Sequence, residues 1–209
     1  MDSLFERYLN LLLEANARLN LTAIRGPEEI RVRHFEDSLR LLEAADFKGA
    51  QVLDVGSGAG FPGLALKIAR PDIRLTLLDA TGKKVRFLQS VCERLQLPDM
   101  TCIHARAEEW ARDAGARERF DIVTARGVAA LPVLSEICLP FVRVGGVFLA
   151  VKEAPEEYSG ASRFGGERRE PFCYTLSNGL NHAVCRFYKA APTPEEYPRA
   201  WGKIRNHPL

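Results

Sequence analysis

The chain has 209 residues, of which 46% are hydrophobic and 27% are charged, and its formal net charge is +2 at pH 7. This composition is that of a globular domain of ordinary size with a small appendage, and no apolar run approaches the roughly 18 residues of a membrane span. The five cysteines are odd in number and scattered, so we expect free thiols in a reducing cytoplasm and neither a disulfide framework nor a metal site.

Two helices are predicted before the first strand. Residues 3–17 carry apolar side chains at three- and four-residue spacing, which is typical of an amphipathic helix. A second helix is predicted to begin at Gly26-Pro27, because proline suits the first helical position, and to end near Gly49. We therefore expect residues 1–48 to form a helical lid that precedes a main domain over residues 49–209.

From residue 51 onward, strand patterns alternate with helix patterns. Strands are predicted over residues 51–55, 74–78, 100–104, 121–125 and 147–152. The segments between them carry helical periodicity, most clearly over residues 82–95. Repeated strand–helix units of this length predict an α/β fold, with a mostly parallel sheet that is covered by helices on both faces.

The last third of the chain departs from this alternation. Two strand-like runs, residues 171–177 and 182–189, flank the hairpin signal Asn178-Gly179, so we expect the sheet to end in an antiparallel pair. Residues 153–170 are predicted as a mobile loop or frayed helix, and the last 20 or so residues as an irregular tail. A parallel sheet with an antiparallel C-terminal hairpin is the Rossmann-like architecture of class I methyltransferases, although a fold by itself does not fix a function.

The stretch QVLDVGSGAGFPG, residues 51–63, joins the first strand to a glycine-rich turn. Glycines such as Gly56 and Gly58 let the backbone turn tightly and approach a nucleotide-like ligand closely. Asp54 precedes this turn, and a carboxylate there would repel the phosphates of a dinucleotide or ATP but attract a cationic ligand. S-adenosylmethionine, with its sulfonium and ammonium groups, is such a ligand, so we expect Asp54 to lie near it. The alternative is that Asp54 caps the turn through its side chain.

Further polar residues follow the second and third strands, where ligands of such sheets bind. Asp79 could accept hydrogen bonds from a ribose diol or cap the next helix, and Ala80 and Thr81 would line an adenosine pocket. Ala107 and Glu108 follow the third strand, in the region expected to meet an adenine ring. A surface glutamate that opens a helix is the simpler interpretation of Glu108.

Four residues carry a charge or a titratable ring, and the sequence does not show what each of them contacts. Arg126 directly follows the fourth strand, where it could hold a phosphate or carboxylate group or pair with a neighbouring acid. Lys83 and Lys84 open a helix, where positive charge is unfavourable against the helix dipole, so the pair either faces an anion or is solvated. His34 lies in the second predicted helix, and a lone histidine is more often a packed or capping residue than a catalyst.

Missing motifs narrow the chemistry. No G-K-[ST] follows the glycines, which excludes a phosphate-binding P-loop. After the fourth strand, residues 124–127 read TARG, in place of the N-P-P-[YFW] tetrapeptide of exocyclic amine methylation or a Pro-Cys pair that could form a cysteine adduct. What remains is transfer to an atom that is already nucleophilic, which requires positioning and little acid–base help.

Six motifs occur in order along nearly the whole chain. They are NLTAI from Asn20, HxxDSL from His34, LDVGSGAGFPG from Leu53, LLDATGKKVRFL from Leu77, FDIVTARGVA from Phe120 and YPR from Tyr197. Together they resemble the RsmG family, also called GidB, whose members are bacterial S-adenosylmethionine-dependent methyltransferases acting on N7 of a guanine in the 530 loop of 16S rRNA. The resemblance implies that residues 49–209 form the methyltransferase domain. It also implies a substrate that is 16S rRNA, the small ribosomal subunit or an assembly intermediate, and we expect a cytoplasmic monomer.

The resemblance also assigns expected roles to residues. Cofactor contacts are implied at Gly56, Phe61, Asp79, Ala80, Thr81, Ala107, Glu108 and Arg126, together with Asp54 and Gly58 of the turn. His34 is implied to lie over the cofactor side of the sheet, and we expect His34 and Arg126 to position the reacting groups. Lys83, Lys84, Lys152 and Arg199 are expected to contact RNA phosphates. Two alternatives stay open: methyl transfer to another acceptor, or a non-catalytic RNA-binding module on the same fold.

Overall fold

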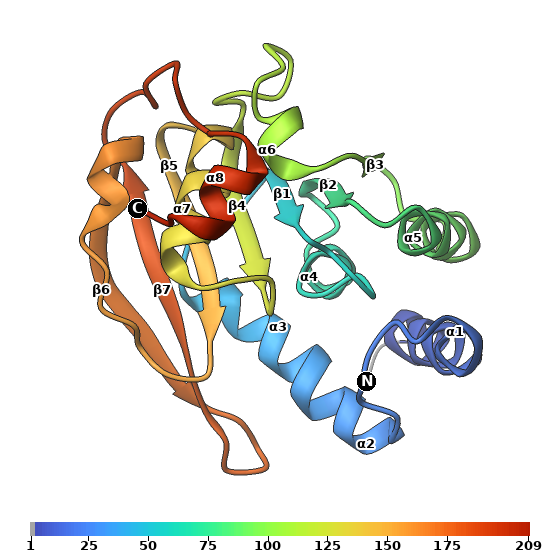
Figure 1. Cartoon of the computed structure of the whole chain (residues 1–209). Helices are drawn as coiled ribbons and strands as arrows, with labels where there is room; N and C mark the ends of the chain where they lie inside the picture. The colour runs from blue at the N-terminus through green and yellow to red at the C-terminus, as the bar shows by residue number, and fades with distance from the viewer. Residues whose placement is uncertain (1–2) are drawn as a thin grey trace.

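Seven strands form one sheet in the computed structural model, which describes residues 3–209 (Figure 1). The strands are β1 (Gln51–Val55), β2 (Arg74–Asp79), β3 (Met100–His104), β4 (Phe120–Arg126), β5 (Val142–Lys152), β6 (Gly166–Thr175) and β7 (Asn181–Lys189). Their order is β3-β2-β1-β4-β5-β7-β6, in which β1 to β5 are parallel and β7 pairs antiparallel with both β5 and β6. The predicted fold class, a mostly parallel sheet with a C-terminal antiparallel hairpin, is confirmed.

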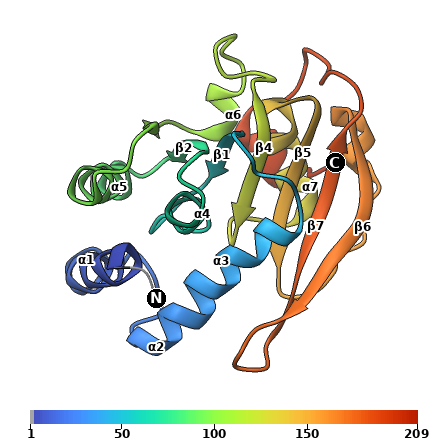
Figure 2. The same ribbon diagram turned by 180° about the vertical axis from the view of Figure 1, so that it is seen from behind.

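Helices cover both faces of this sheet (Figures 1 and 2). They are α1 (Ser3–Leu19), α2 (Pro27–Ile30), α3 (Asp37–Leu39), α4 (Gly63–Ala69), α5 (Gly82–Leu95), α6 (Ala107–Trp110), α7 (Leu131–Cys138) and α8 (Trp201–Asn206). One hydrophobic core lies on the side of α1, α4 and α5, and a second on the side of α6, α7 and α8. Strand β1 feeds both cores: Val52 packs in the first, and Leu53 and Val55 in the second. This is the pattern of a parallel strand buried on both faces.

The N-terminal helices pack against the glycine-rich turn through aromatic rings. A π-helical segment, Arg31–Glu36, joins α2 to α3, so the chain from Pro27 to Leu39 runs as one continuous helix. Tyr8 and Phe35 are buried, and their rings lie 5.2 and 5.6 Å from the ring of Phe61 in the turn. These contacts hold α1 and the continuous helix from Pro27 to Leu39 beside the turn, and these two helices are called the lid helices only for this position. A π-helical stretch is itself frequent near functional sites.

Several boundaries differ from the sequence expectations. The prediction of a mobile loop or frayed helix over residues 153–170 is wrong in part, because β6 already begins at Gly166. The 3₁₀ helix Gly160–Phe164 agrees with the short-helix alternative. Strand β6 is the edge of the sheet, so its outward residues are solvated and its apolar pattern is weak. The tail, predicted as irregular, contains α8, whose Trp201 and Ile204 pack on the second core.

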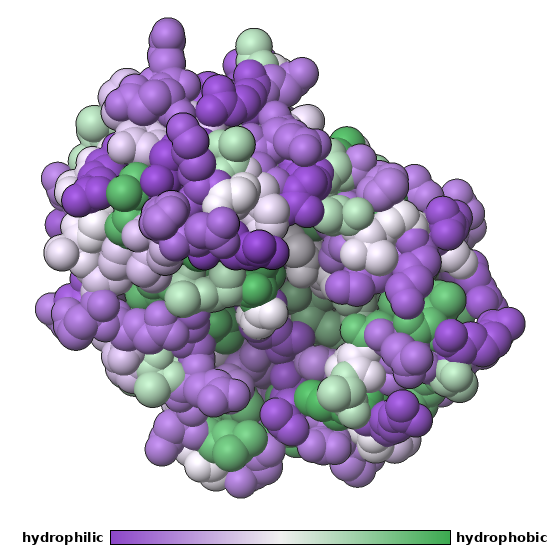
Figure 3. All heavy atoms as spheres, viewed as in Figure 1, coloured by the Kyte–Doolittle hydropathy of each residue, from purple (hydrophilic) through white to green (hydrophobic). Residues whose placement is uncertain are grey.

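The surface is mainly hydrophilic on the face shown in Figure 3, with hydrophobic areas that are small and separate. Between residues 3 and 209, no helix has the length and hydropathy to cross a membrane. The carboxyl ends of β1, β4 and β5 face the lid helices (Figure 1). Ligands of open α/β sheets bind at this edge, so the candidate site is expected there.

Candidate active site

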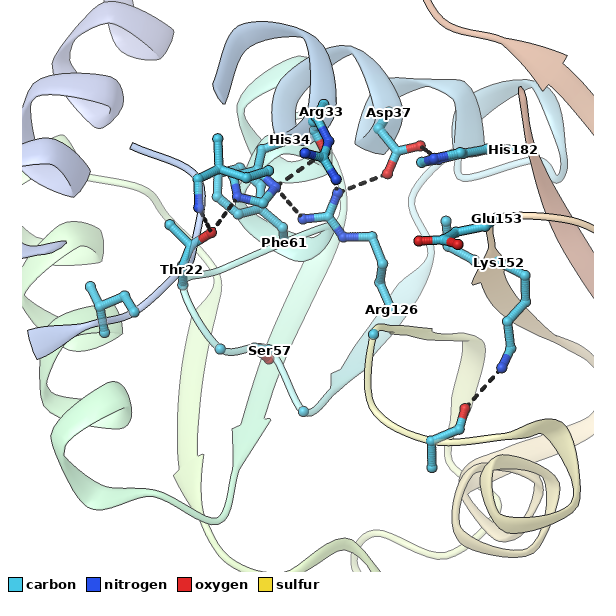
Figure 4. A pocket seen from close by; sticks show the side chains of 18 of the residues that line it. Thr22, Arg33, His34, Asp37, Ser57, Phe61, Arg126, Lys152, Glu153 and His182 are labelled. Atoms are coloured by element: carbon cyan, nitrogen blue, oxygen red, sulfur yellow. Dashed lines mark hydrogen bonds and ion pairs between the residues drawn. The ribbon is translucent and has the colours of Figure 1, made fainter. Parts of the chain in front are cut away.

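A cavity of about 690 Å³ lies where the lid helices meet the carboxyl ends of the parallel strands (Figure 4). Its wall is formed by the glycine-rich turn, the lid helices and the ends of β4, β5 and β7. Six of the lining residues bear most on its chemistry: His34, Asp37, Gly56, Gly58, Phe61 and Arg126. The structure thus brings together the predicted turn, His34 and Arg126.

The glycine-rich turn leaves an open backbone face toward this cavity. Gly58 has a φ of +59°, a left-handed conformation that disfavours residues with a Cβ. A Cβ at Gly58 would meet only the carbonyl oxygen of Gly56, 3.8 Å away, so a ligand can approach the backbone here. At Gly60 a Cβ would instead come within 2.5 Å of the Tyr8 hydroxyl. Gly58 is therefore open to a ligand, whereas Gly60 is required by packing.

Asp54 lies beneath the turn and does not line the cavity. Its Oδ1 accepts a hydrogen bond from Oγ1 of Thr124 (2.9 Å), its Oδ2 accepts one from the amide of Gly63 (3.2 Å), and the residue is fully buried. Burial raises the pKa of Asp54 to about 6, while the two hydrogen bonds and the charge of Arg126 oppose this shift. Asp54 thus ties β1 to β4 and to the start of α4, and its charge acts on the cavity from below.

Asp79 holds the other side of the turn. Its Oδ2 accepts a hydrogen bond from the Gly58 amide (3.0 Å), and its Oδ1 accepts one from the Thr81 amide (2.8 Å). Lys84 Nζ also approaches Oδ2 to 3.7 Å. Asp79 is buried, whereas Ala80 beside it is exposed. Asp79 therefore orders both the turn and the start of α5, and Ala80 is the most accessible residue of the predicted adenosine set.

Ala107 and Glu108 begin α6 and lie outside the cavity wall. Glu108 is buried and forms an ion pair with Arg106. The Arg106 guanidinium in turn lies 4.8 Å from the centroid of the Trp201 ring. The tail helix α8 therefore packs against the segment that was expected to meet an adenine ring.

Arg126 is the centre of a hydrogen-bond network in the cavity wall (Figure 4). Its Nη1 donates to Oδ2 of Asp37 (2.8 Å) and to the carbonyl of Arg33 (3.0 Å). Its Nη2 lies 2.8 Å from Nδ1 of His34, and its Cζ lies 5.3 Å from the centroid of the Phe61 ring. These contacts hold the guanidinium between the end of β4 and the lid helices. The pairing of Arg126 with a neighbouring acid, one of its two open interpretations, is present.

His34 is a buried bridge between two elements of the site. Its ring stacks on Phe61 with centroids 4.5 Å apart, and its Nε2 lies 2.9 Å from Oγ1 of Thr22. Burial and, next, the charge of Arg126 lower the pKa of His34 to about 3. The imidazole is therefore neutral at physiological pH and serves as a packed hydrogen-bonding group.

Sequence reasoning missed three members of this network. Asp37 was recognised only as part of a motif, and Tyr174 and His182 were not singled out at all. Asp37 Oδ1 accepts hydrogen bonds from the Tyr174 hydroxyl (2.7 Å) and from Nδ1 of His182 (2.6 Å). Tyr174 and His182 are direct cross-strand partners in the β6–β7 hairpin. The hairpin signal could have paired them only if the register had been known.

The lysines predicted to contact RNA separate into two groups. Lys84 and Lys152 line the cavity, and Nζ of Lys152 forms an ion pair with Glu156 (3.1 Å). Lys83 is exposed on α5, and its Nζ donates to the carbonyl of Leu19 (3.2 Å). Of these three lysines, Lys84 and Lys152 line the same cavity as Arg126 and His34, and Lys83 does not.

Arg199 is engaged inside the protein. Its amide, Nε and Nη2 bond to the carboxylate of Glu136 at 2.9, 2.8 and 2.7 Å, and Glu136 is fully buried. A buried carboxylate needs such a partner, because leaving it unpaired is costly. This arrangement anchors the tail and argues against the RNA contact expected for Arg199.

Known proteins share both the sequence and the fold of this chain. Residues 1–163 match the model of the GidB family, described as rRNA small subunit methyltransferase G. A relative from Acetivibrio thermocellus, named Ribosomal RNA small subunit methyltransferase G, is 42% identical over 98% of this chain and 87% of its own length. A relative of the same name from Geobacillus kaustophilus is also 42% identical, over 98% of this chain and 90% of its own.

Solved structures match at lower identity and show the fold alone. A SAM dependent methyltransferase from Aquifex aeolicus aligns with a TM-score of 0.58 and 13% identity, over 80% of this chain and 96% of that one. A mutant of MtNAS in complex with S-adenosylmethionine aligns with a TM-score of 0.60 and 17% identity, over 89% and 76% of the two chains. The family match and the 42% identical relatives go further: this chain belongs to the rRNA small subunit methyltransferase G family.

Proposed function

We propose that this protein transfers the methyl group of S-adenosylmethionine to N7 of a guanine in the 530 loop of 16S rRNA. Its family membership supports the proposal, since its relatives are named Ribosomal RNA small subunit methyltransferase G. The motifs that resemble the RsmG family support it further. When bound, S-adenosylmethionine supplies an electrophilic methyl group on a sulfonium centre. The task of the protein is then to bind, orient and shield the two reactants.

The residues around the glycine-rich turn fit this cofactor. The open backbone at Gly58 accepts a close approach. Asp54 beneath it has a pKa of about 6, so it is ionised at neutral pH and favours a cationic ligand over a phosphate. The segment from Asp79 to Thr81, in which Ala80 is exposed, would hold the ribose, whereas Glu108 is buried outside the cavity and paired with Arg106.

The hydrogen bonds among Arg126, His34 and Asp37 are the observation that favours N7 of guanine as the methyl acceptor. His34 has a pKa of about 3 and both of its ring nitrogens are in hydrogen bonds, while both oxygens of Asp37 accept hydrogen bonds. These groups are therefore poorly suited to removing a proton from a substrate. N7 of guanine has an in-plane lone pair and carries no proton, so its methylation needs no general base. Arg126 and Phe61 would act by positioning the base.

Access to the cavity requires the guanine to leave its stack. A cavity of about 690 Å³ is within the size range of ligand sites and opens to solvent beside the lid helices. Lys84 and Lys152 in its wall carry positive charge, which suits the phosphates that flank a flipped nucleotide. These lysines are our candidates for RNA contacts at the site.

Methyl transfer from labelled S-adenosylmethionine tests the proposal. The substrates are naked 16S rRNA, small subunits that lack the modification, and an assembly intermediate. We expect label in at least one of them, and chemical cleavage at 7-methylguanine should map it to one guanine of the 530 loop. The matched control is the same RNA with 7-deazaguanine at that position, which should accept no methyl group. Label that persists on the deaza substrate would contradict N7 as the acceptor.

A further inference from the structure

The carboxylate of Asp37 joins three segments that are distant in the sequence. Its Oδ2 accepts a hydrogen bond from Arg126 at the end of β4 (2.8 Å). Its Oδ1 accepts hydrogen bonds from Tyr174 on β6 (2.7 Å) and from Nδ1 of His182 on β7 (2.6 Å). Figure 4 shows the carboxylate between Arg126 and His182. Asp37 is 1% exposed, so these donors take the place of water.

The two oxygens of Asp37 have separate duties. The hairpin holds Oδ1, which leaves Oδ2 to meet one nitrogen of the Arg126 guanidinium. A carboxylate with both oxygens free tends to bind a guanidinium through two parallel hydrogen bonds. Such pairing would draw Nη1 or Nη2 away from the Arg33 carbonyl or from His34, which they now contact. The hairpin donors therefore help to decide where the guanidinium points.

We infer that Tyr174 and His182 are positioning residues for methyl transfer. By holding Oδ1 of Asp37, they restrict it to a single hydrogen bond with Arg126 and so fix the guanidinium over Phe61 at the cavity wall. The inference rests on the proposed role of Arg126 in orienting the reacting groups. It assigns the C-terminal hairpin a part in the reaction in addition to closing the sheet.

The chain offers a matched control for this role. Glu36, next to Asp37, also bonds to the hairpin, through the amide (2.8 Å) and hydroxyl (2.6 Å) of Ser177. Neither Glu36 nor Ser177 lines the catalytic cavity or contacts Arg126. The Ser177→Ala variant therefore weakens the attachment of the hairpin to the lid without touching the Asp37 network.

Steady-state methyl transfer to small-subunit RNA, cofactor binding by calorimetry and thermal unfolding test the inference. Tyr174→Phe and His182→Leu each remove one donor to Oδ1, and we expect each to lower kcat about tenfold, with the KM for RNA within about twofold of wild type. His182→Asn keeps a donor near the position of Nδ1 and should recover most of the loss. Ser177→Ala should have the kcat of wild type. Tyr174→Phe in an Arg126→Lys background should cost little more than Arg126→Lys alone, because both changes act through one contact.

The outcomes separate the inference from the proposed function. If Arg126→Lys is impaired but Tyr174→Phe and His182→Leu keep the kcat of wild type, the positioning role is overturned and the function stands. If Arg126→Lys also turns over normally, the role of Arg126 fails and the inference with it. If Ser177→Ala loses as much kcat as the other two, the hairpin contributes only stability. Should His182→Leu not fold, Tyr174→Phe still decides, since it removes one hydroxyl group and keeps the ring.

Discussion

Nη2 of Arg126 lies 2.8 Å from Nδ1 of His34, and because a guanidinium can only donate, this contact favours an Nδ1 without a proton. The carbonyl of Arg33 lies 3.1 Å from the same Nδ1 and would accept a hydrogen bond from a protonated Nδ1, so the two contacts favour different tautomers of the neutral ring. Nε2 lies 2.9 Å from Oγ1 of Thr22, a hydroxyl that can accept from a protonated Nε2 or donate to an unprotonated one. A second proton on His34 would face the positive charge of Arg126 inside the protein. The site is therefore built to hold a neutral imidazole, and protonation of His34 should open it.

His34→Gln keeps a donor that can reach Thr22 and removes the titrating group. The folded pKa of His34, about 3, lies below its ordinary value of 6.5, so the unfolded state binds more protons between these pH values. The wild type should therefore lose stability relative to His34→Gln as the pH falls from about 6.5 toward 3. Urea unfolding at several pH values between 4 and 7 measures this difference. A difference that stays constant over this range would contradict the assignment.

Asp54→Asn should show the opposite dependence on pH. The folded pKa of Asp54, about 6, lies above its ordinary value of 3.8, so its contribution to stability is present below about pH 4 and is lost as the pH rises through 6. Relative to wild type, Asp54→Asn should gain up to about 3 kcal/mol in free energy of unfolding between pH 4 and pH 7. This change with pH does not depend on the constant loss caused by presenting an amide to Gly63. The same urea series measures it.

The charge of Asp54 should also govern cofactor affinity. An ionised Asp54 beneath the turn attracts the sulfonium and ammonium groups of S-adenosylmethionine, whereas a protonated one does not. We therefore expect the calorimetric affinity of wild type to weaken as the pH falls through about 6, and that of Asp54→Asn to be weak and nearly independent of pH. If Asp54→Asn binds S-adenosylmethionine with wild-type affinity at pH 7.5, the charge of Asp54 does not contribute to cofactor binding.

Arg126→Lys and Arg126→Ala should separate activity from stability. Alanine leaves the buried Asp37 without its cationic partner, so Arg126→Ala is expected to lose about 3–5 kcal/mol of stability along with its activity. Lysine keeps the charge beside Asp37 but cannot reach His34 and Arg33 at the same time. Arg126→Lys should therefore unfold near the wild-type temperature while kcat falls on the order of 100-fold. A normal kcat in Arg126→Lys would show that charge alone suffices.

Local sequence patterns predict most of the strands and turns of this fold. They do not predict how deeply an individual side chain is buried. The pattern around β1 predicted a strand, a glycine-rich turn and a carboxylate beside them. Alternation along β1 puts Asp54 on the same face as Val52, toward α4. That the turn then covers Asp54 depends on tertiary packing of the lid and α4, which strand periodicity does not encode.

The register of the β6–β7 hairpin is a second feature that the sequence did not predict. A two-residue turn at Asn178-Gly179 would pair Tyr174 with Ala183, but the structure pairs Tyr174 with His182. The observed loop is longer, because the amide of Leu176 bonds to the carbonyl of Leu180, and Gly179 takes a φ of +84°. A shift of one residue moves a side chain to the other face of a sheet. The contribution of His182 to the site was therefore beyond a prediction based on turn residues alone.

Gly58→Ala and Gly60→Ala form a matched pair within the turn. At Gly58 a Cβ has space, so alanine should cost only the roughly 1–2 kcal/mol of a left-handed backbone. At Gly60 a Cβ would lie 2.4 Å from Cδ1 of Leu64 and 2.5 Å from the Tyr8 hydroxyl, which adds overpacking of a further 1–3 kcal/mol or so. We expect Gly58→Ala to fold but bind S-adenosylmethionine weakly, and Gly60→Ala to fail mainly in thermal unfolding. Equal cofactor affinity in Gly58→Ala and wild type would show that the cofactor does not bind against the backbone at Gly58.

Arg199→Ala distinguishes an anchor from an RNA contact. Without Arg199 the carboxylate of Glu136 stays buried and unpaired, so the free energy of unfolding should fall by about 3–5 kcal/mol. The salt dependence of RNA binding should not change, because the guanidinium of Arg199 is already paired with the carboxylate of Glu136. Arg25→Ala is the control: Arg25 is exposed beside the cavity-lining Ile24, so its loss should spare stability. If Arg25 meets a phosphate, its loss should also reduce the slope of log affinity against log salt by about 1. If Arg199→Ala reduces the slope of log affinity against log salt and leaves stability unchanged, Arg199 contacts RNA.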